Sequence, residues 1–364
     1  MMLTDLIGTV AGAVLVGVFG ILVALFLMGV DRIVTARMQA RIGPPLSQPL
    51  TDLRKLFIKE NVVPANAIPW LFNLAPVIAL ASAITILLYI PVGGFPPVLS
   101  GGGDLILVMY LLTLPALALV AGGFSSGSPY ATVGAQREMV TMIAYEFPLA
   151  VVIIAIAWKL AVSGIPLPFM LASVQANPVW GLVGPIGIIG VLILFFVLLI
   201  VTPAELSRIP FDTPEAETEL AGGVLVEYSG KNLALFTLTQ GVKTVVMASL
   251  VVALFIPYRL SAILPAPVIL QPVLDLLFYL VLVVLVAFVA VSLIRVSMAR
   301  FRINQVVSVY WIYFSLIGIA GMLLIMADHF LAKSVPAYWM YFPVLLPGDL
   351  FMTIAGHIMG VPWP

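Results

Sequence analysis

Long apolar stretches alternate with short polar ones along almost the whole chain. A helix that crosses the bilayer core needs about 20 apolar residues. The segments that meet this length are 6–30, 69–91, 104–123, 139–161, 181–202, 233–257, 270–294 and 305–327. We therefore predict an all-α, polytopic membrane protein in which eight transmembrane helices form a single membrane domain over residues 1–364, with no soluble domain.

The two ends of the chain need separate treatment. No basic residue precedes the first apolar stretch, which is too long for a signal peptide, so we interpret it as the first transmembrane helix. The last stretch, 337–359, is interrupted by Pro343, Pro347 and Gly348. Since proline and glycine break helices, we predict a proline-broken C-terminal tail that is interfacial or re-entrant.

Composition agrees with a membrane protein and excludes several kinds of site. Hydrophobic residues make up 63% of the chain and charged residues 9%, against about 25% charged in soluble domains. The net charge is zero, so nothing indicates nucleic-acid binding. The chain has no cysteine, which excludes a disulfide, a thiolate zinc site and a cysteine-ligated iron–sulfur cluster within it.

The basic residues gather on one side of the predicted membrane domain. The loops 31–68, 124–138, 203–232 and 295–304, with their helix ends, hold most of them: Arg32, Arg37, Arg41, Arg54, Lys55, Lys59, Arg137, Arg208, Lys231, Arg295, Arg300 and Arg302. The other side holds only Lys159, Arg259 and Lys333. The positive-inside rule therefore predicts cytoplasmic loops, extracytoplasmic termini and a cell-membrane location. If the tail crosses the bilayer, the C-terminus moves inside.

The first predicted cytoplasmic loop contains an apolar pattern at helical spacing. A rigid break at 43–45 is followed by Leu50, Leu53, Leu56 and Phe57, with charged residues between them. Such a pattern is typical of an amphipathic helix that lies in the membrane interface. The simpler alternative is a basic anchor whose long side chains reach the headgroups.

Two ionisable residues fall inside predicted transmembrane helices. Glu146 lies about two turns into the fourth segment, and Lys243 lies near the middle of the sixth. Such groups are costly unless they are paired or face water, which makes them candidates for function. A pair between Glu146 and Lys243 would keep both charged, whereas a plain interfacial carboxylate bonded to hydroxyls is the alternative for Glu146.

The loop at 203–232 is acidic although it lies on the basic side. Its carboxylates are Glu205, Asp212, Glu215, Glu217, Glu219 and Glu227, against Arg208 and Lys231. A solvated, disordered charge run is one interpretation. Apolar residues such as Phe211, Leu220 and Tyr228 alternate with the charges, however, so the loop can pack. Neighbouring packed carboxylates push their pKa values apart, as a proton relay requires.

These segments resemble the large-loop membrane subunit of respiratory complex I and its relatives in membrane-bound hydrogenases. The resemblance is carried by the stretch from Arg208 to Leu220, which contains Pro210-Phe211-Asp212-Thr213-Pro214-Glu215, and by 227–230. Arg41-Ile42-Gly43-Pro44 and 55–60 match the first-loop motif of the family. A short run to Gln48-Pro49, and Gly-Ser-Pro at 127–129 with the Arg137-Glu138 pair, look more like the hydrogenase-type members and the related sulfane-sulfur reductases.

The resemblance implies a subunit without a redox centre of its own. It would bind peripheral-arm catalytic subunits that carry iron–sulfur clusters, and a nickel–iron site in hydrogenases, together with antiporter-like membrane subunits that move protons or sodium. The residues expected in coupling or the ion path are Glu146, Lys243, Asp212, Glu215, Glu217, Glu219 and Glu227. Those expected in docking or gating are Arg41, Arg137, Glu138, Arg208 and Tyr228. A quinone-site subunit of a complex-I-type dehydrogenase and a stand-alone transporter are the competing hypotheses.

Overall fold

The computed structural model describes residues 2–262, 267 and 270–334, and within them it confirms eight helices long and apolar enough to cross a membrane. The predicted tail at 337–359 lies outside the described residues. The long helices are α1 (Met2–Met38), α3 (Pro69–Tyr89), α4 (Asp104–Ser125), α5 (Pro129–Val162), α7 (Pro185–Glu205), α9 (Gly230–Phe255), α10 (Gln271–Ala287) and α13 (Ser315–Ser334).

Shorter elements complete the described chain. Near one end of the long helices lie α2 (Gln48–Ile58), the 3-10 turns η2 (Thr213–Glu215) and η3 (Gly223–Leu225), and α8 (Glu217–Leu220). The other connections contain α6 (Leu171–Ala176), η1 (Val179–Gly181) and η4 (Leu260–Ala262). The last two spans contain π-helical turns, η5 (Phe288–Leu293) before α11 (Ile294–Ser297) and η6 (Ser308–Phe314) after α12 (Ile303–Val307).

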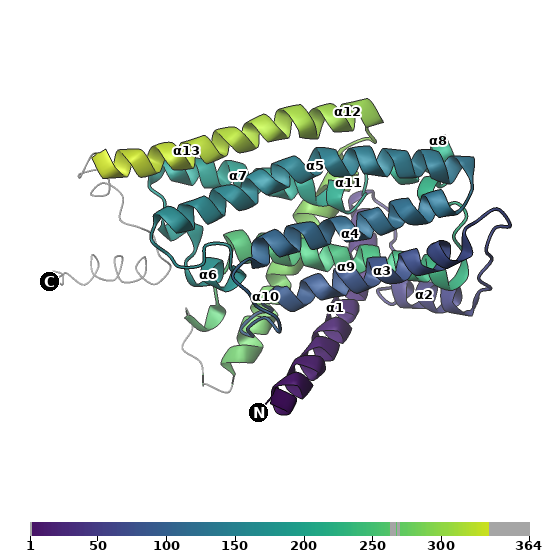
Figure 1. Ribbon diagram of the computed structural model, residues 1–364, viewed down its shortest axis with the longest axis horizontal. Helices are drawn as coiled ribbons and strands as arrows, with labels where there is room; N and C mark the ends of the chain where they lie inside the picture. The colour runs from purple at the N-terminus through teal and green to yellow at the C-terminus, as the bar shows by residue number, and fades with distance from the viewer. Residues whose placement is uncertain (1, 263–266, 268–269, 335–364) are drawn as a thin grey trace.

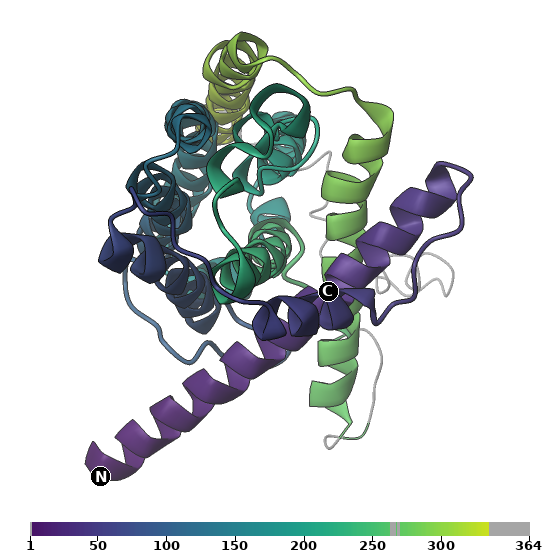
Figure 2. The same ribbon diagram turned by 90° about the vertical axis from the view of Figure 1, so that its right-hand side faces the viewer.

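The long helices surround α9, which is almost wholly buried. Most of them run side by side in Figure 1 and are seen nearly end-on in Figure 2, whereas α1 and α10 cross the bundle obliquely. We call the end of the bundle that carries α2, η2, α8 and η3 the loop end, and the other the far end. The helix α2 is present as predicted and packs Leu53 against α9, while its position at a membrane interface stays a prediction.

The largest difference from the sequence-based segments concerns α5. This helix begins at Pro129, ten residues before the predicted segment 139–161, so most of the predicted loop 124–138 is helical. Proline is favoured in the first helical turn, where its missing N–H costs nothing. The small residues that suggested a loop instead allow close packing, because a Cβ on Gly134 would lie 2.6 Å from the backbone nitrogen of Val224.

Candidate functional site

The acidic loop between α7 and α9 is packed rather than disordered, as its interleaved apolar residues predicted. Phe211, Leu220 and Val224 are buried within it. Gly223 has φ +56°, and a Cβ on it would lie 1.8 Å from the carbonyl oxygen of Pro214, so only glycine fits where the loop crosses itself. The loop therefore has one defined path over the loop end of the bundle.

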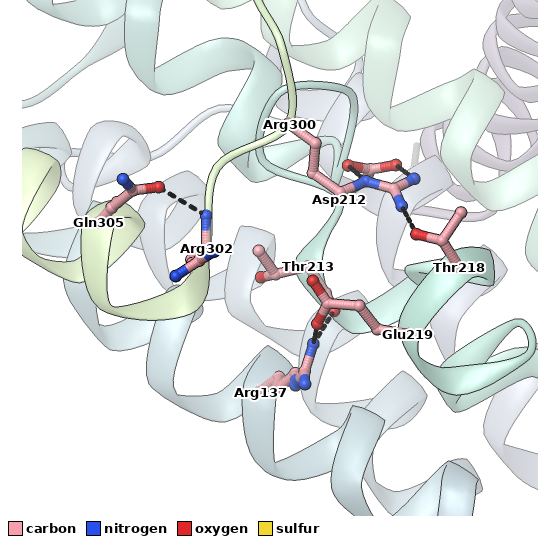
Figure 3. Close-up of polar contacts among 8 residues, drawn as sticks. All are labelled: Arg137, Asp212, Thr213, Thr218, Glu219, Arg300, Arg302 and Gln305. Atoms are coloured by element: carbon pink, nitrogen blue, oxygen red, sulfur yellow. Dashed lines mark hydrogen bonds and ion pairs between the residues drawn. The ribbon is translucent and has the colours of Figure 1, made fainter.

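Two arginines from neighbouring segments fasten the outside of the loop, as Figure 3 shows. Arg137, on α5, approaches the Glu219 carboxylate at 2.5 Å. Arg300, between α11 and α12, donates to both oxygens of Asp212, at 2.8 and 2.5 Å, and to the Thr218 hydroxyl at 3.0 Å. The hydrogen bonds with Asp212 raise the pKa of Arg300. The loop is thus tied to the fourth and last spans by bidentate and single ion pairs.

Tyr228 fastens the other side of the loop. Its ring stacks on Phe72 of α3 at 4.1 Å and meets Phe236 of α9 edge-on at 4.9 Å, and its hydroxyl donates to the Phe72 carbonyl oxygen at 3.2 Å. Burial raises the pKa of the Tyr228 hydroxyl. This side chain is buried, which contradicts direct docking of a partner on it, while a gating role stays a prediction.

A buried ion pair lies directly beneath the loop. The Lys243 ammonium is 2.8 Å from Oε1 of Glu205, at the end of α7, and also donates to the Glu205 carbonyl oxygen at 2.7 Å. Both side chains are at most 7% exposed. An isolated lysine at this depth would be very costly, so the Glu205 carboxylate allows α9 to carry it.

A second buried carboxylate, Glu138 of α5, faces the same space. Its Oε2 accepts a hydrogen bond from the Ser207 hydroxyl at 3.3 Å, and only 2% of the residue is exposed. It shares a helix face with Thr141 and Tyr145, which are also buried, because their spacing of three and four residues follows the helical repeat. The prediction that Glu138 docks a partner directly is therefore wrong, because the lengthened α5 turns this residue inward.

These charged groups line a cavity of about 30 Å³. Its polar walls come from Glu138, Glu205, Ser207, Thr239, Gln240 and Lys243. A polar cavity needs roughly 10–15 Å³ to hold a water molecule that has two to four partners. This one has room for about two waters. Waters between two carboxylates and an ammonium can carry protons from one to another.

Gln240 connects this cavity to the acidic loop. Its amide donates to Oε1 of Glu215 at 2.6 Å. Burial raises the pKa of Glu215 to about 6, while Arg208 opposes the rise and the nearby Asp212 adds to it. A carboxyl group that titrates close to neutral pH thus lies one hydrogen bond from the cavity wall, which is the property expected of a proton relay.

Arg208 faces a second cavity, of about 20 Å³, between α1, α9 and the π-helical turn η5. The other polar groups on its wall are Asp31, Thr244 and Ser292. Asp31 accepts hydrogen bonds from Ser292 at 2.7 Å and from Arg295 at 3.1 Å. Burial lowers the pKa of Arg208, and its Nε is buried with no hydrogen-bond partner among the described residues. A water in the cavity would satisfy that donor.

The predicted pair between Glu146 and Lys243 is wrong, because Lys243 pairs with Glu205. Glu146 is only partly buried on α5, and its carboxylate repels that of Glu205. Sequence reasoning counted Glu205 among the acidic residues and did not single it out, since the predicted fifth segment ended at residue 202. The signal available was an acidic residue within one turn of a segment end.

The remaining predicted residues lie on the outside of the loop end. Glu217 and Arg41 are exposed, and the Arg41 guanidinium donates to the Gln39 side chain. Glu227 is partly buried beside the Tyr228 anchor. The structure therefore separates the predicted set into an inner group around the cavity and an outer group at the surface.

Comparisons with known proteins identify relatives over most of the chain. Residues 11–326 match the family described as NADH dehydrogenase. The chain is 35% identical to hydrogenase-4 component C of Escherichia coli (strain K12) over 80% of this chain and 88% of that protein. It is 32% identical to a membrane component of the NADH-quinone oxidoreductase of Rhizobium meliloti (strain 1021), with the same two coverages.

A solved structure shows the same fold. A chain of the membrane-bound sulfane sulfur reductase, an archaeal respiratory membrane complex, superposes with a TM-score of 0.74 at 29% sequence identity. The match covers 87% of this chain and 99% of that chain.

Proposed function

Because this chain belongs to the NADH dehydrogenase family, whose relatives are membrane subunits of oxidoreductase complexes, we propose that it anchors and couples such a complex. In this role it binds a peripheral arm at the loop end and links electron transfer there to proton or sodium translocation. The iron–sulfur clusters, and a nickel–iron site where the complex is a hydrogenase, belong to the partner subunits. Antiporter-like membrane subunits receive the coupling signal.

One observation carries this proposal. A water-sized cavity brings Glu138, Glu205 and Lys243 together inside the membrane domain, and Gln240 joins it to Glu215 in the acidic loop. A charge that arrives at the loop end changes the protonation of Glu215. In a medium of low dielectric constant, one charge change shifts the pKa of a neighbour by units. The loop thereby passes an electrostatic signal to the buried ion pair.

The outer group supplies the docking surface. The exposed residues Arg41, Glu217 and Glu219 lie at the loop end, which the positive-inside count predicts to be cytoplasmic. Arg137 and Arg300 hold the loop against the bundle, so a partner that rests on it presses on a structure with a fixed path. Docking and coupling then use opposite faces of the same loop.

The test is Glu205→Gln in the complete complex, reconstituted in vesicles. The variant keeps the shape of the side chain and removes the charge that pairs with Lys243. We expect electron transfer within about twofold of wild type and at least a tenfold loss of ion translocation. Glu60→Gln, an exposed carboxylate at the same end, is the matched control. Full translocation in Glu205→Gln would refute the coupling role of the cavity.

A quinone-site subunit is the second candidate, because several relatives are subunits of NADH-quinone oxidoreductases. Pockets for drug-sized ligands measure roughly 300–1,000 Å³, and the cavity between Glu138 and Lys243 measures about 30 Å³. Its size therefore favours the hydrogenase or sulfur-reductase type. Inhibition of electron transfer by a quinone-site inhibitor, relieved by substitution of Arg41, would favour the quinone type instead.

A further inference from the structure

The far end of the bundle contains a polar cavity that the proposed coupling site does not use. It measures about 20 Å³ and lies where α10 meets the segment that follows α9. Gln175, Arg259, Asp275 and Tyr279 provide its polar groups. Its volume suffices for one water.

The carboxylate in this cavity is held in a built site. Asp275 is 6% exposed and accepts hydrogen bonds from the backbone nitrogen of Ser261 at 2.8 Å and from its hydroxyl at 2.7 Å. The turn at Gly93 and Gly94 lies against it so closely that a Cβ on Gly94 would be 3.2 Å from Oδ2 of Asp275. Since a carboxylate offers about four acceptor sites, two remain for water.

A pair of hydroxyl groups extends the polar path from this cavity toward the membrane centre. Tyr279 lines the cavity one helical turn from Asp275, and its hydroxyl donates to the Ser249 hydroxyl at 2.6 Å. Ser249 is fully buried on α9, six residues from Lys243. Six residues of helix span about 9 Å.

The far-end cavity nearly meets the cavity beside Arg208 along α10. Leu282 belongs to the wall of the far-end cavity, and Val284 belongs to the wall of the cavity beside Arg208. Two residues of helix rise only about 3 Å. Val283 of α10 and Val245 and Ala248 of α9 are buried in the same apolar cluster, so a thin apolar layer separates the two polar spaces.

We propose that the seam between α9 and α10 is a proton exit path through this chain, with Leu282 and Val283 as its apolar gate. The path runs from the cavity beside Arg208 and Thr244, past the gate, through Ser249 and Tyr279, to Asp275. It rests on the proposed coupling function, because that function supplies the protons. It differs from a purely lateral signal to antiporter-like subunits, since here protons leave through this subunit.

The chemistry of the path suits protons better than sodium ions. Ser249 accepts a proton from the inner side as it releases its own to Tyr279, and Tyr279 releases its own to a water beside Asp275. Neither residue keeps a net charge, and both hydroxyls then rotate back to the arrangement seen here. Arg259 on the cavity wall repels a metal cation, and hydroxyl hydrogen bonds transmit protons alone.

Cysteine accessibility tests the path without reference to turnover. The chain has no cysteine, so one introduced thiol is the only thiol of this subunit. We make Ser249→Cys in the complete complex, treat right-side-out membranes with silver ions, and measure protection from later alkylation. We expect protection from the far end. Val251→Cys, buried at a similar depth on α9, is the matched control and stays unprotected. An unprotected Ser249→Cys overturns the proposal whatever the coupling role of Glu205.

Transport measurements provide the second test. We expect Tyr279→Phe and Asp275→Asn to lower protons released per electron at least threefold while electron transfer continues. Tyr89→Phe and Asp104→Asn remove a phenol and a buried carboxyl group at the far end outside the path, and they keep the wild-type ratio. If Glu205→Gln uncouples and Tyr279→Phe does not, the coupling function stands and the exit path is refuted. A loss of sodium rather than proton release also refutes it.

Discussion

The raised pKa of Glu215 leads to a measurable pH dependence of coupling. Burial moves this pKa from its ordinary value of 4.5 to about 6, against the opposing charges of Arg208 and Lys243. At pH 7 the neutral fraction rises from about 0.3% to about 10%, which is about thirtyfold. The same difference corresponds to about 2 kcal/mol that disfavours the charged form in the folded protein.

The sign of the effect follows from the direction of the shift. Because the folded pKa lies above the ordinary value, the cost of the buried charge is absent below about pH 4.5 and complete above about pH 6. The thermal stability of the complex should therefore fall as the pH rises through this window. Glu215→Gln mimics the neutral form, so its stability should lack this fall.

The assay compares ion translocation per electron between about pH 5 and pH 8. In the wild type we expect an inflection near pH 6, where Glu215 changes charge. Glu215→Gln should remove the inflection and keep the hydrogen bond to Gln240, whose amide can still donate to the new side chain. Glu60→Gln, exposed at the same end, should leave the profile unchanged. An inflection that persists in Glu215→Gln would refute the assignment.

Three further substitutions test the packing around the site. Lys243→Met leaves Glu205 buried without its partner, so the thermal midpoint of the purified complex should drop by the equivalent of about 3–5 kcal/mol, and adding Glu205→Gln should recover most of it. Arg300→Ala removes the bidentate contact with Asp212, and hydrogen exchange in the acidic loop should rise by the equivalent of about 1–2 kcal/mol; unchanged protection would show that the contact is not needed. Gly223→Ala places a Cβ 1.8 Å from a carbonyl oxygen of η2, so the subunit should fail to accumulate in the complex, and normal assembly would contradict the described loop path.

The sequence was sufficient for the elements that depend on apolar length alone. The eight spans and the helix at 48–58 follow from runs and spacing of apolar residues, which the bilayer and the helical repeat constrain directly. The start of α5 was missed because glycine, serine and alanine before Arg137 are typical of loops when read locally. Only contacts with the acidic loop, distant in sequence, explain why small residues are needed there.

The site was predictable as a set of residues but not as a set of pairs. Lys243 and the acidic loop were recognised from their cost in a membrane, yet the partner of Lys243 depends on how α7 and α9 are placed relative to each other. Periodicity within one helix contains no information about that placement. The same reason explains why Glu138 and Tyr228 were expected at the surface and are buried.

The burial of α9 has a consequence for how the protein enters the membrane. This helix has the lowest hydropathy of the eight spans and carries Lys243 near its middle. A lysine at that depth opposes insertion of a single helix by roughly 2.5–3.5 kcal/mol. The Glu205 carboxylate that pairs with it stands at the end of α7, the span synthesised just before. The two helices are therefore expected to leave the translocon as one hairpin, and the ion pair would then help the newly made chain reach its correct topology before any partner subunit binds.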